Sequence, residues 1–305
     1  MPRRRWSACL LLVAVLVAGC EQPVPPGRTV RIATGSPTAV YYAIGNAYAR
    51  ILSAELPGTS AEALVTAASA ANVALVRDGG AEVGFTQADI LNGLPQSSSI
   101  SAMARVYDDH LHLVVAARGR IQRLADLRGR AVSVGAPGSG TEVTTGRLLA
   151  TAGLTGALTE SRLGLDDSAA ELAAGHIDAF FFSGGLPVAA VNQLSRRTPI
   201  RLIDLGEWVG PLRKRYGDVY VARDVPRSVY GLPVITTVAV PNYLIVRNDL
   251  PRGLVYDLTR LLIEKRDQLG RAHPAAEQLN ARSAITTAPL PLHPGAIAYY
   301  RDAKH

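Results

Sequence analysis

The chain has 305 residues, 48% of them hydrophobic and 19% charged, with a formal net charge of +7. It carries no basic block and no aromatic–basic stripe, which argues against a nucleic-acid-binding protein. Cys9 and Cys20 are its only cysteines. Once Cys9 is removed with an N-terminal leader, as expected below, an internal disulfide and a cysteine metal site are both excluded.

The N-terminal segment predicts export. Three arginines precede an apolar run, residues 10–17, which is too short for a permanent membrane span but suits a cleaved signal peptide over residues 1–19. The sequence Val17-Ala18-Gly19-Cys20 resembles a bacterial lipobox. We therefore expect a lipid on Cys20, an anchor in the bacterial membrane and a Pro/Gly tether over residues 20–29, with the protein in the periplasm or at the cell surface. The alternative is an ordinary signal peptide followed by a chance cysteine.

Strand-like and helical patterns then alternate, which is typical of an α/β protein with largely parallel strands. Strands are predicted at residues 29–34, 62–66, 82–87, 110–117, 131–134 and 178–182, and as two extended pieces around Pro241 within 234–246. Helices are predicted at residues 37–53, 70–77, 125–129, 141–152 and 254–269.

The order of these elements predicts two lobes. We expect residues 30–116 and 238–305 to form lobe 1 and residues 117–237 to form lobe 2, with chain crossings near residues 116 and 237. A ligand cleft would then lie between the hinged lobes.

One glycine-rich loop predicts an anion-binding helix start. Residues 135–142 follow a strand and open a helix, and Ser139 and Glu142 have the spacing of a capping box. Glycines allow close approach to the backbone, and a helix start offers free N–H groups and a partial positive charge. The loop lacks the lysine of a nucleotide P-loop. The alternative is a plain, well-capped helix.

Other strand-end loops point to the same cleft. In lobe 1, Pro37 suits a first helical position after Gly35 and Ser36, Tyr41 follows one turn later, and Ser69 is expected to cap the next helix. The predicted ligand-binding residues are Gly35, Ser36, Tyr41, Ser69 and Gln87 in lobe 1, and Ser139, Gly140, Thr141, Ser183 and Gly184 in lobe 2. Simple turns remain the alternative for the loop at Ser183 and Gly184, and Gln87 could merely bond a neighbouring loop.

Several motifs in this order resemble one known family. They include Ile32-Ala33-Thr34-Gly35, the segment 83–89, the glycine-rich segment 132–142 and Leu292-His293-Pro294-Gly295-Ala296. The chain resembles the TAXI family, the solute receptors of one class of tripartite ATP-independent periplasmic (TRAP) transporters, over residues 30–300.

This resemblance implies a type II periplasmic-binding-protein-like fold that closes on a small carboxylate, such as a glutamate-like or 2-oxoglutarate-like dicarboxylate. It also implies delivery to a TRAP-type permease. Three residues depart from the family pattern: Ala39, Ala67 and Ala68 stand at positions where the family often has glycine. Their methyl groups put the identity of the ligand in doubt.

Rival functions find less support. Ser139 lacks nucleophile-elbow spacing and a nearby histidine, so we expect no enzyme activity. His110 and His112 share a strand face without a third ligand, so we expect no metal and no cofactor, and His112 to pack in the strand. Asp108 and Asp109 are interpreted as a solvated turn. We expect a monomer; a receptor of the same fold that reports to a signalling partner remains the alternative function.

Overall fold

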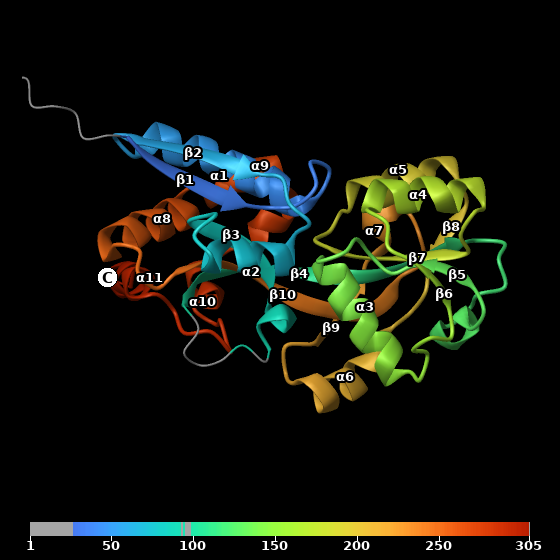
Figure 1. The fold of residues 1–305 in the computed structure, drawn as a ribbon. Helices are drawn as coiled ribbons and strands as arrows, with labels where there is room; N and C mark the ends of the chain where they lie inside the picture. The colour runs from blue at the N-terminus through green and yellow to red at the C-terminus, as the bar shows by residue number, and fades with distance from the viewer. Residues whose placement is uncertain (1–26, 93, 95–98, 305) are drawn as a thin grey trace, which may run out of the picture.

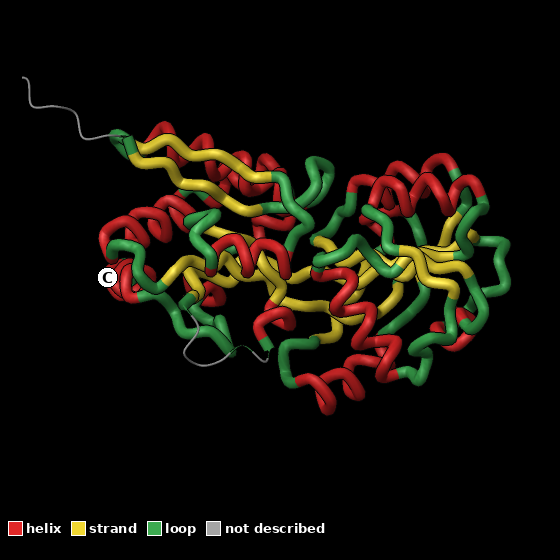
Figure 2. Tube along the Cα trace, in the orientation of Figure 1, coloured by secondary structure: helices red, strands yellow, loops and turns green. Residues whose placement is uncertain are grey.

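The computed structural model describes residues 27–92, 94 and 99–304. The predicted signal peptide, Cys20 and most of the tether lie outside these residues. Within the described part, one ten-stranded sheet runs through the molecule in the order β2-β1-β3-β10-β4-β7-β5-β6, with β8 added to β4 and β9 to β10. Helices cover both faces of the sheet in each of two halves (Figures 1 and 2).

The first half contains a parallel group of strands and the helices packed on it. Its strands are β1 (Arg28–Ala33), β2 (Thr59–Leu64) and β3 (Val83–Gln87). Its helices are α1 (Val40–Glu55), α2 (Ser69–Arg77), the 3-10 helix η1 (Ala88–Leu91), α8 (Arg252–Glu264), α9 (Arg266–Ala272), the 3-10 helix η4 (Pro274–Gln278), α10 (Ala281–Ala284) and α11 (Pro294–Asp302).

The second half repeats this plan, but three of its five strands have only three residues. Its strands are β5 (Ala131–Ser133), β6 (Thr159–Ser161), β7 (Ala179–Gly184), β8 (Ile200–Leu202) and β9 (Val221–Val225). Its helices are the 3-10 helix η2 (Leu124–Leu127), α3 (Gly140–Thr151), α4 (Leu165–Ala174), α5 (Ala189–Arg197), the 3-10 helix η3 (Gly206–Trp208), α6 (Val209–Tyr216) and α7 (Arg227–Tyr230).

Two long antiparallel strands join the halves: β4 (Ile100–Ala116) and β10 (Ile235–Arg247). They pair with each other over much of their length, and β4 turns from β10 to β7 at His110. Likewise, β10 pairs with β9 up to Ala239 and with β3 from Asn242 onward. Figure 1 shows both strands crossing the centre of the molecule. The lobe boundaries at residues 116 and 237 stay a prediction.

Amphipathic patterning places the helices. On α1, residues Ile44, Tyr48, Ile51 and Leu52 repeat at helical spacing and are at most 7% exposed. Tyr48 also donates a hydrogen bond to the carbonyl oxygen of Leu258 on α8 at 2.5 Å. Burying each large apolar side chain contributes about 1.5–3 kcal/mol, so such contacts stabilise the first half without a disulfide.

Several predicted elements differ from the structure; the strand predicted at residues 62–66, for example, spans Thr59–Leu64. The first helix begins at Val40, not Pro37, with extended Ala39 as its N-cap. Strand β4 begins at Ile100, not at His110. Its first part was not predicted because the strand is buried on both faces, so its sequence lacks the alternation of apolar and polar residues that would mark a start. The extended pieces around Pro241 are one strand, in which the proline lies beside a register irregularity between Asn242 and Tyr243.

The predicted helix over residues 254–269 breaks at Lys265 into α8 and α9. The Nζ atom of Lys265 pairs there with Glu55 at the end of α1.

No helix among residues 27–92, 94 and 99–304 is long and apolar enough to cross a membrane.

Candidate ligand-binding site

A cavity of about 110 Å³ lies between the two halves. That volume approaches the ~150 Å³ of a cavity known to hold a benzene-sized molecule. Nine of the ten predicted binding residues line it, namely Ser36, Tyr41, Ser69, Gln87, Ser139, Gly140, Thr141, Ser183 and Gly184. Gly35 does not; it packs behind the wall, where a Cβ atom would lie 3.6 Å from that of Ala68. The cavity brings these residues together, while their part in binding stays a prediction.

The start of α3 forms one wall of the cavity. Ser139 is its N-cap, and its Oγ atom accepts a hydrogen bond from the backbone N–H of Glu142 at 3.1 Å. The Glu142 carboxylate accepts from the N–H of Gly138 at 2.8 Å instead of completing the box at Ser139. The N–H groups of Gly140 and Thr141 open the helix and therefore have no acceptor within it. They are available to an anion in the cavity, which they would meet with the positive end of the helix dipole.

Two contacts hold this helix start in place. The backbone of Gly135 has φ +103°, and a Cβ atom there would lie 2.8 Å from the side chain of Thr141, so only glycine fits. The hydroxyl of Thr141 accepts a hydrogen bond from the N–H of Ser183 at the end of β7, at 3.0 Å. Its own proton remains free to be donated to a ligand.

The opposite wall comes from the first half. Ser69 does not cap α2, contrary to expectation: it is the first helical residue and Ala68 is the N-cap. The Ser69 hydroxyl instead lies 3.2 Å from the hydroxyl of Tyr41 and 3.2 Å from the N–H of Gln87, which donates to it. Tyr41 stacks on Phe85, with ring centroids 5.0 Å apart, and donates a short hydrogen bond to Oδ1 of Asn242.

Gln87 connects the two walls. Its Nε2 atom donates to Oδ2 of Asp109 at 2.8 Å and to the hydroxyl of Ser183 at 2.5 Å. Its Oε1 atom accepts from the hydroxyl of Thr144 on α3 at 3.3 Å. The amide therefore bonds the end of β3 to β7 and α3 in the second half, and is already committed before any ligand binds.

Asp109 corrects the sequence analysis. It is neither solvated nor in a turn: it lies in the middle of β4, is 3% exposed and lines the cavity. Burial raises the pKa of its carboxyl to about 7, against the hydrogen bond from Gln87, which lowers it. Tyr107, two residues earlier on the same strand face, also lines the cavity. This spacing of two would have pointed to both residues had the strand been predicted to start at Ile100.

Asp108 is likewise buried, at 4% exposure, but it is not among the residues that line the cavity. It pairs with Arg105 at 2.5 Å and with Arg223 at 2.9 Å. His112 packs in β4 as expected, fully buried, with Nε2 3.0 Å from the hydroxyl of Tyr230. Among the described residues, no cluster of three or more His, Cys, Asp or Glu side chains could hold a metal ion.

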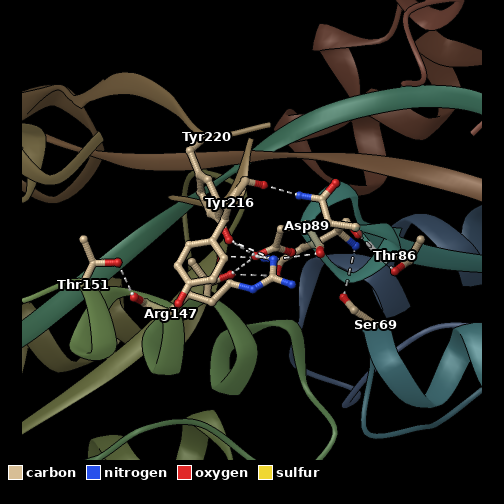
Figure 3. A network of polar contacts seen from close by, with 11 residues as sticks. Ser69, Thr86, Asp89, Arg147, Thr151, Tyr216 and Tyr220 are labelled. Carbon is tan, nitrogen blue, oxygen red and sulfur yellow. Dashed lines mark hydrogen bonds and ion pairs between the residues drawn. The ribbon is translucent and has the colours of Figure 1, made fainter. Parts of the chain in front are cut away.

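A second polar network joins the halves next to the cavity (Figure 3). Asp89 on η1 is fully buried, and its Oδ2 atom accepts hydrogen bonds from Thr144 at 2.8 Å and Tyr220 at 3.0 Å. Arg147 on α3 lies 3.8 Å from the same oxygen and donates to the backbone carbonyl of Asp89 at 2.8 Å. Its guanidinium also lies over the ring of Tyr216, 5.1 Å from the centroid. Sequence reasoning gave no sign of this network, because its members are far apart along the chain.

Ala68 has a strained backbone. Its φ of 77° and ψ of −144° lie near a region adopted essentially by glycine, and it is the only non-glycine residue of the described chain with positive φ. Its side chain lines the cavity next to Ala67. Ala39, Ala67 and Ala68 all line the cavity, and the backbone conformation of Ala68 costs energy, while a narrowing effect of their methyl groups stays a prediction.

Replacing Ala68 with glycine is expected to raise the free energy of unfolding by about 1 kcal/mol. Relief of about 1–3 kcal/mol of strain outweighs the roughly 0.4–1 kcal/mol that glycine adds to the entropy of the unfolded chain. Urea unfolding measures the change. Ala67→Gly is the matched control, since residue 67 has no positive φ, and should lower stability instead. Equal losses in both variants would show that position 68 is not strained.

Comparison with known structures shows what this architecture is similar to. The periplasmic aliphatic sulphonate binding protein SsuA from Escherichia coli matches with a TM-score of 0.52 and 14% identity, covering 90% of this chain and 83% of that one. A putative L-cystine ABC transporter protein from Listeria monocytogenes matches with a TM-score of 0.54 and 13% identity, covering 82% of this chain and 97% of that one. An ancestral arginine-binding protein bound to arginine matches with a TM-score of 0.52 and 15% identity, covering 82% of this chain and 99% of that one. These matches confirm the predicted α/β fold of the periplasmic-binding-protein type.

Family membership comes from a separate comparison. The model of the NMT1-like family matches residues 32–303, which include all the described strands except the start of β1 and every residue of the cavity wall. The chain therefore belongs to the NMT1-like family.

Proposed function

We propose that this chain is a solute-binding receptor that captures a small carboxylate in the cavity and delivers it to a TRAP-type permease. One observation carries the proposal: the start of α3, whose first N–H groups have no acceptor within the helix, lines a cavity whose other wall belongs to the first half. The folds of the sulphonate-, cystine- and arginine-related proteins agree with a binding role. The resemblance of the sequence motifs to TAXI receptors favours a glutamate-like or 2-oxoglutarate-like ligand and a permease partner.

Closure follows from the position of the donors. An anion that leaves water must regain several hydrogen bonds, because an unpaired buried charge costs several kcal/mol. Gly140 and Thr141 supply donors from the second half, and Tyr41 and Ser69 stand on the other wall. The full set exists only when the halves are together. The ligand therefore favours the closed state through contacts that the open state lacks.

Thr141 provides the direct test. In a thermal-shift screen of small carboxylates, we expect a hit that isothermal titration converts to a Kd, and Thr141→Ala should weaken it about tenfold, corresponding to ~1.4 kcal/mol. Thr141→Ser, which keeps the hydroxyl that accepts from Ser183, should bind nearly as the native chain. A hit whose affinity is the same in all three proteins would place the carboxylate elsewhere. The ligand should be recovered unaltered, since we propose binding without catalysis.

Export remains part of the proposal. Cleavage before Cys20 and acylation of its thiol would place the receptor at the membrane on the outer side, where such a permease takes its solute. Cys20→Ser should release the protein from the membrane fraction, and the mature protein should lack residues 1–19 by mass spectrometry. An intact Met1 would contradict both the cleavage and the anchor.

A further inference from the structure

Asp109 is the only charged side chain among the described residues that line the cavity. Its Oδ2 atom is held by Gln87, whereas its Oδ1 atom has no hydrogen-bond partner. The hydroxyl of Tyr107, on the same wall, has none either. Buried polar groups are nearly always paired in native proteins, so two unpaired groups on residues that line one cavity point to a partner that the ligand supplies.

The protein itself does not neutralise this carboxylate. Arg105 and Arg223 are taken by Asp108, and Arg147 is taken by Asp89. A weak hydrogen bond from the amide of Asn242 lowers the pKa of Asp109, although its Nδ2 atom does not reach good hydrogen-bond geometry, and the amide brings no charge that would neutralise the carboxylate. Burial dominates and raises the pKa, as expected for an acid without a cation beside it.

The two walls of the cavity thus have opposite character. The start of α3 offers N–H donors and the positive end of a helix dipole, and suits a carboxylate. The Asp109 wall offers acceptors and a negative charge, and suits a cationic donor. The cavity wall carries no lysine, arginine or histidine among its described residues, so a second carboxylate on the ligand would meet no cation.

We propose that the ligand carries a protonated amino group beside its carboxylate, and that Asp109, with the Tyr107 hydroxyl, accepts hydrogen bonds from it. This inference rests on the proposed function and narrows it: the ligand is an amino acid, and Asp109 sets the preference for it over the corresponding 2-oxo acid. The carbonyl of an oxo acid has no proton to donate. Opposite ionised Asp109, the form that prevails above its pKa of about 7, it would leave Oδ1 unpaired or bring two acceptors together. Sites with buried polar groups discriminate strongly against analogues that leave them unpaired, so the preference is expected to be fully developed at pH 8.

Matched ligand pairs test the inference. The standard amino acids and three 2-oxo acids are first screened by thermal shift on the native mature chain. Alanine with pyruvate, valine with 2-oxoisovalerate and glutamate with 2-oxoglutarate are then compared by isothermal titration. In whichever pair binds, the amino acid is expected to bind about 10- to 100-fold more tightly, the range of one strong charge-assisted hydrogen bond. Asp109→Asn should reduce that ratio to within about threefold, because the amide keeps the size of the carboxylate and loses its charge.

Asp108→Asn is the matched control. It makes the same change one residue away, at a carboxylate that faces Arg105 and Arg223, and should leave the ratio as in the native chain. Circular dichroism checks the folding of both variants, and if Asp109→Asn does not fold, the ratio in the native protein still decides the matter.

The outcomes separate the two claims. A 2-oxo acid that binds as tightly as its amino acid, with Thr141→Ala weakening both, overturns the inference and leaves the carboxylate receptor standing. A preference for the amino acid that survives Asp109→Asn overturns the assignment to Asp109. Binding only of another small carboxylate from the wider screen overturns the inference alone, and binding of no carboxylate overturns the proposed function and the inference together.

Discussion

Gly140→Val is expected to weaken ligand binding by at least about 100-fold while the protein stays folded. A Cβ atom at position 140 would lie 2.0 Å from Oε1 of Gln87, 2.5 Å from its Cδ and 2.8 Å from the hydroxyl of Ser69. Both neighbours belong to the first half, so the collision is between the halves and not within α3. The sequence suggests that a branched side chain here would block the ligand; in the structure it blocks closure as well.

The loss follows from the missing contacts. If α3 cannot approach β3 and α2, the donors on the two walls no longer surround one ligand, and two strong hydrogen bonds correspond to about 3 kcal/mol or a 100-fold change. Titration with the hit from the carboxylate screen measures the affinity, and small-angle scattering measures the expected increase in radius of gyration. Gly146→Val is the matched control: the same substitution, in the same helix, at an exposed position with open space around it. Native affinity and dimensions for Gly140→Val would show that the halves do not need this contact.

The features of the site that sequence could predict are those encoded locally. The start of α3 follows a strand, and its serine cap and glycines stand within a few residues, so the loop is readable without knowing the fold. Gln87 and Ser183 are strand-end residues for the same reason. In each case, the order strand, loop, helix decides which edge of the sheet a residue reaches.

Asp109 and Asp89 were beyond such reasoning. Two adjacent aspartates resemble a surface turn, and only the continuation of β4 through residue 109 buries one toward the cavity and the other toward two arginines. The pair of Asp89 and Arg147 joins residues that meet only after the chain has built β4 and returned through α3. The strain at Ala68 was also hidden, because its positive φ is set by how α2 enters the sheet.

Arg147→Met is the second change with a large expected effect, a loss of about 3 kcal/mol in the free energy of unfolding near pH 8. Methionine keeps the apolar stem of the side chain but removes the charge closest to the fully buried Asp89, and breaking a buried pair from one side costs about 3–5 kcal/mol. We expect the lower end, because Arg147 retains 19% exposure and its ion-pair distance is 3.8 Å. The hydrogen bonds from Thr144 and Tyr220 to Asp89 remain.

The loss should shrink as the pH falls. Burial raises the pKa of Asp89 above its ordinary value, and the attraction of Arg147 opposes that rise, so removing Arg147 raises this pKa further. A carboxyl with a raised folded-state pKa favours folding below its unfolded pKa, and this contribution disappears as the pH rises through the folded pKa. Protonated Asp89 needs no cation, so the variant should recover part of its stability at pH 5.

A double-mutant cycle separates this pair from its surroundings. Asp89→Asn keeps an acceptor for Thr144 and Tyr220 and removes the charge, so Arg147→Met in that background should cost clearly less than in the native chain at pH 8. Urea unfolding of the four proteins at pH 5 and pH 8 gives the coupling free energy at each pH. Losses that simply add at both values would mean that the charge of Arg147 does not stabilise Asp89. A coupling present at pH 8 and reduced at pH 5 would show that this ion pair, which joins residues of the two halves next to the cavity, stabilises the folded protein before any ligand binds.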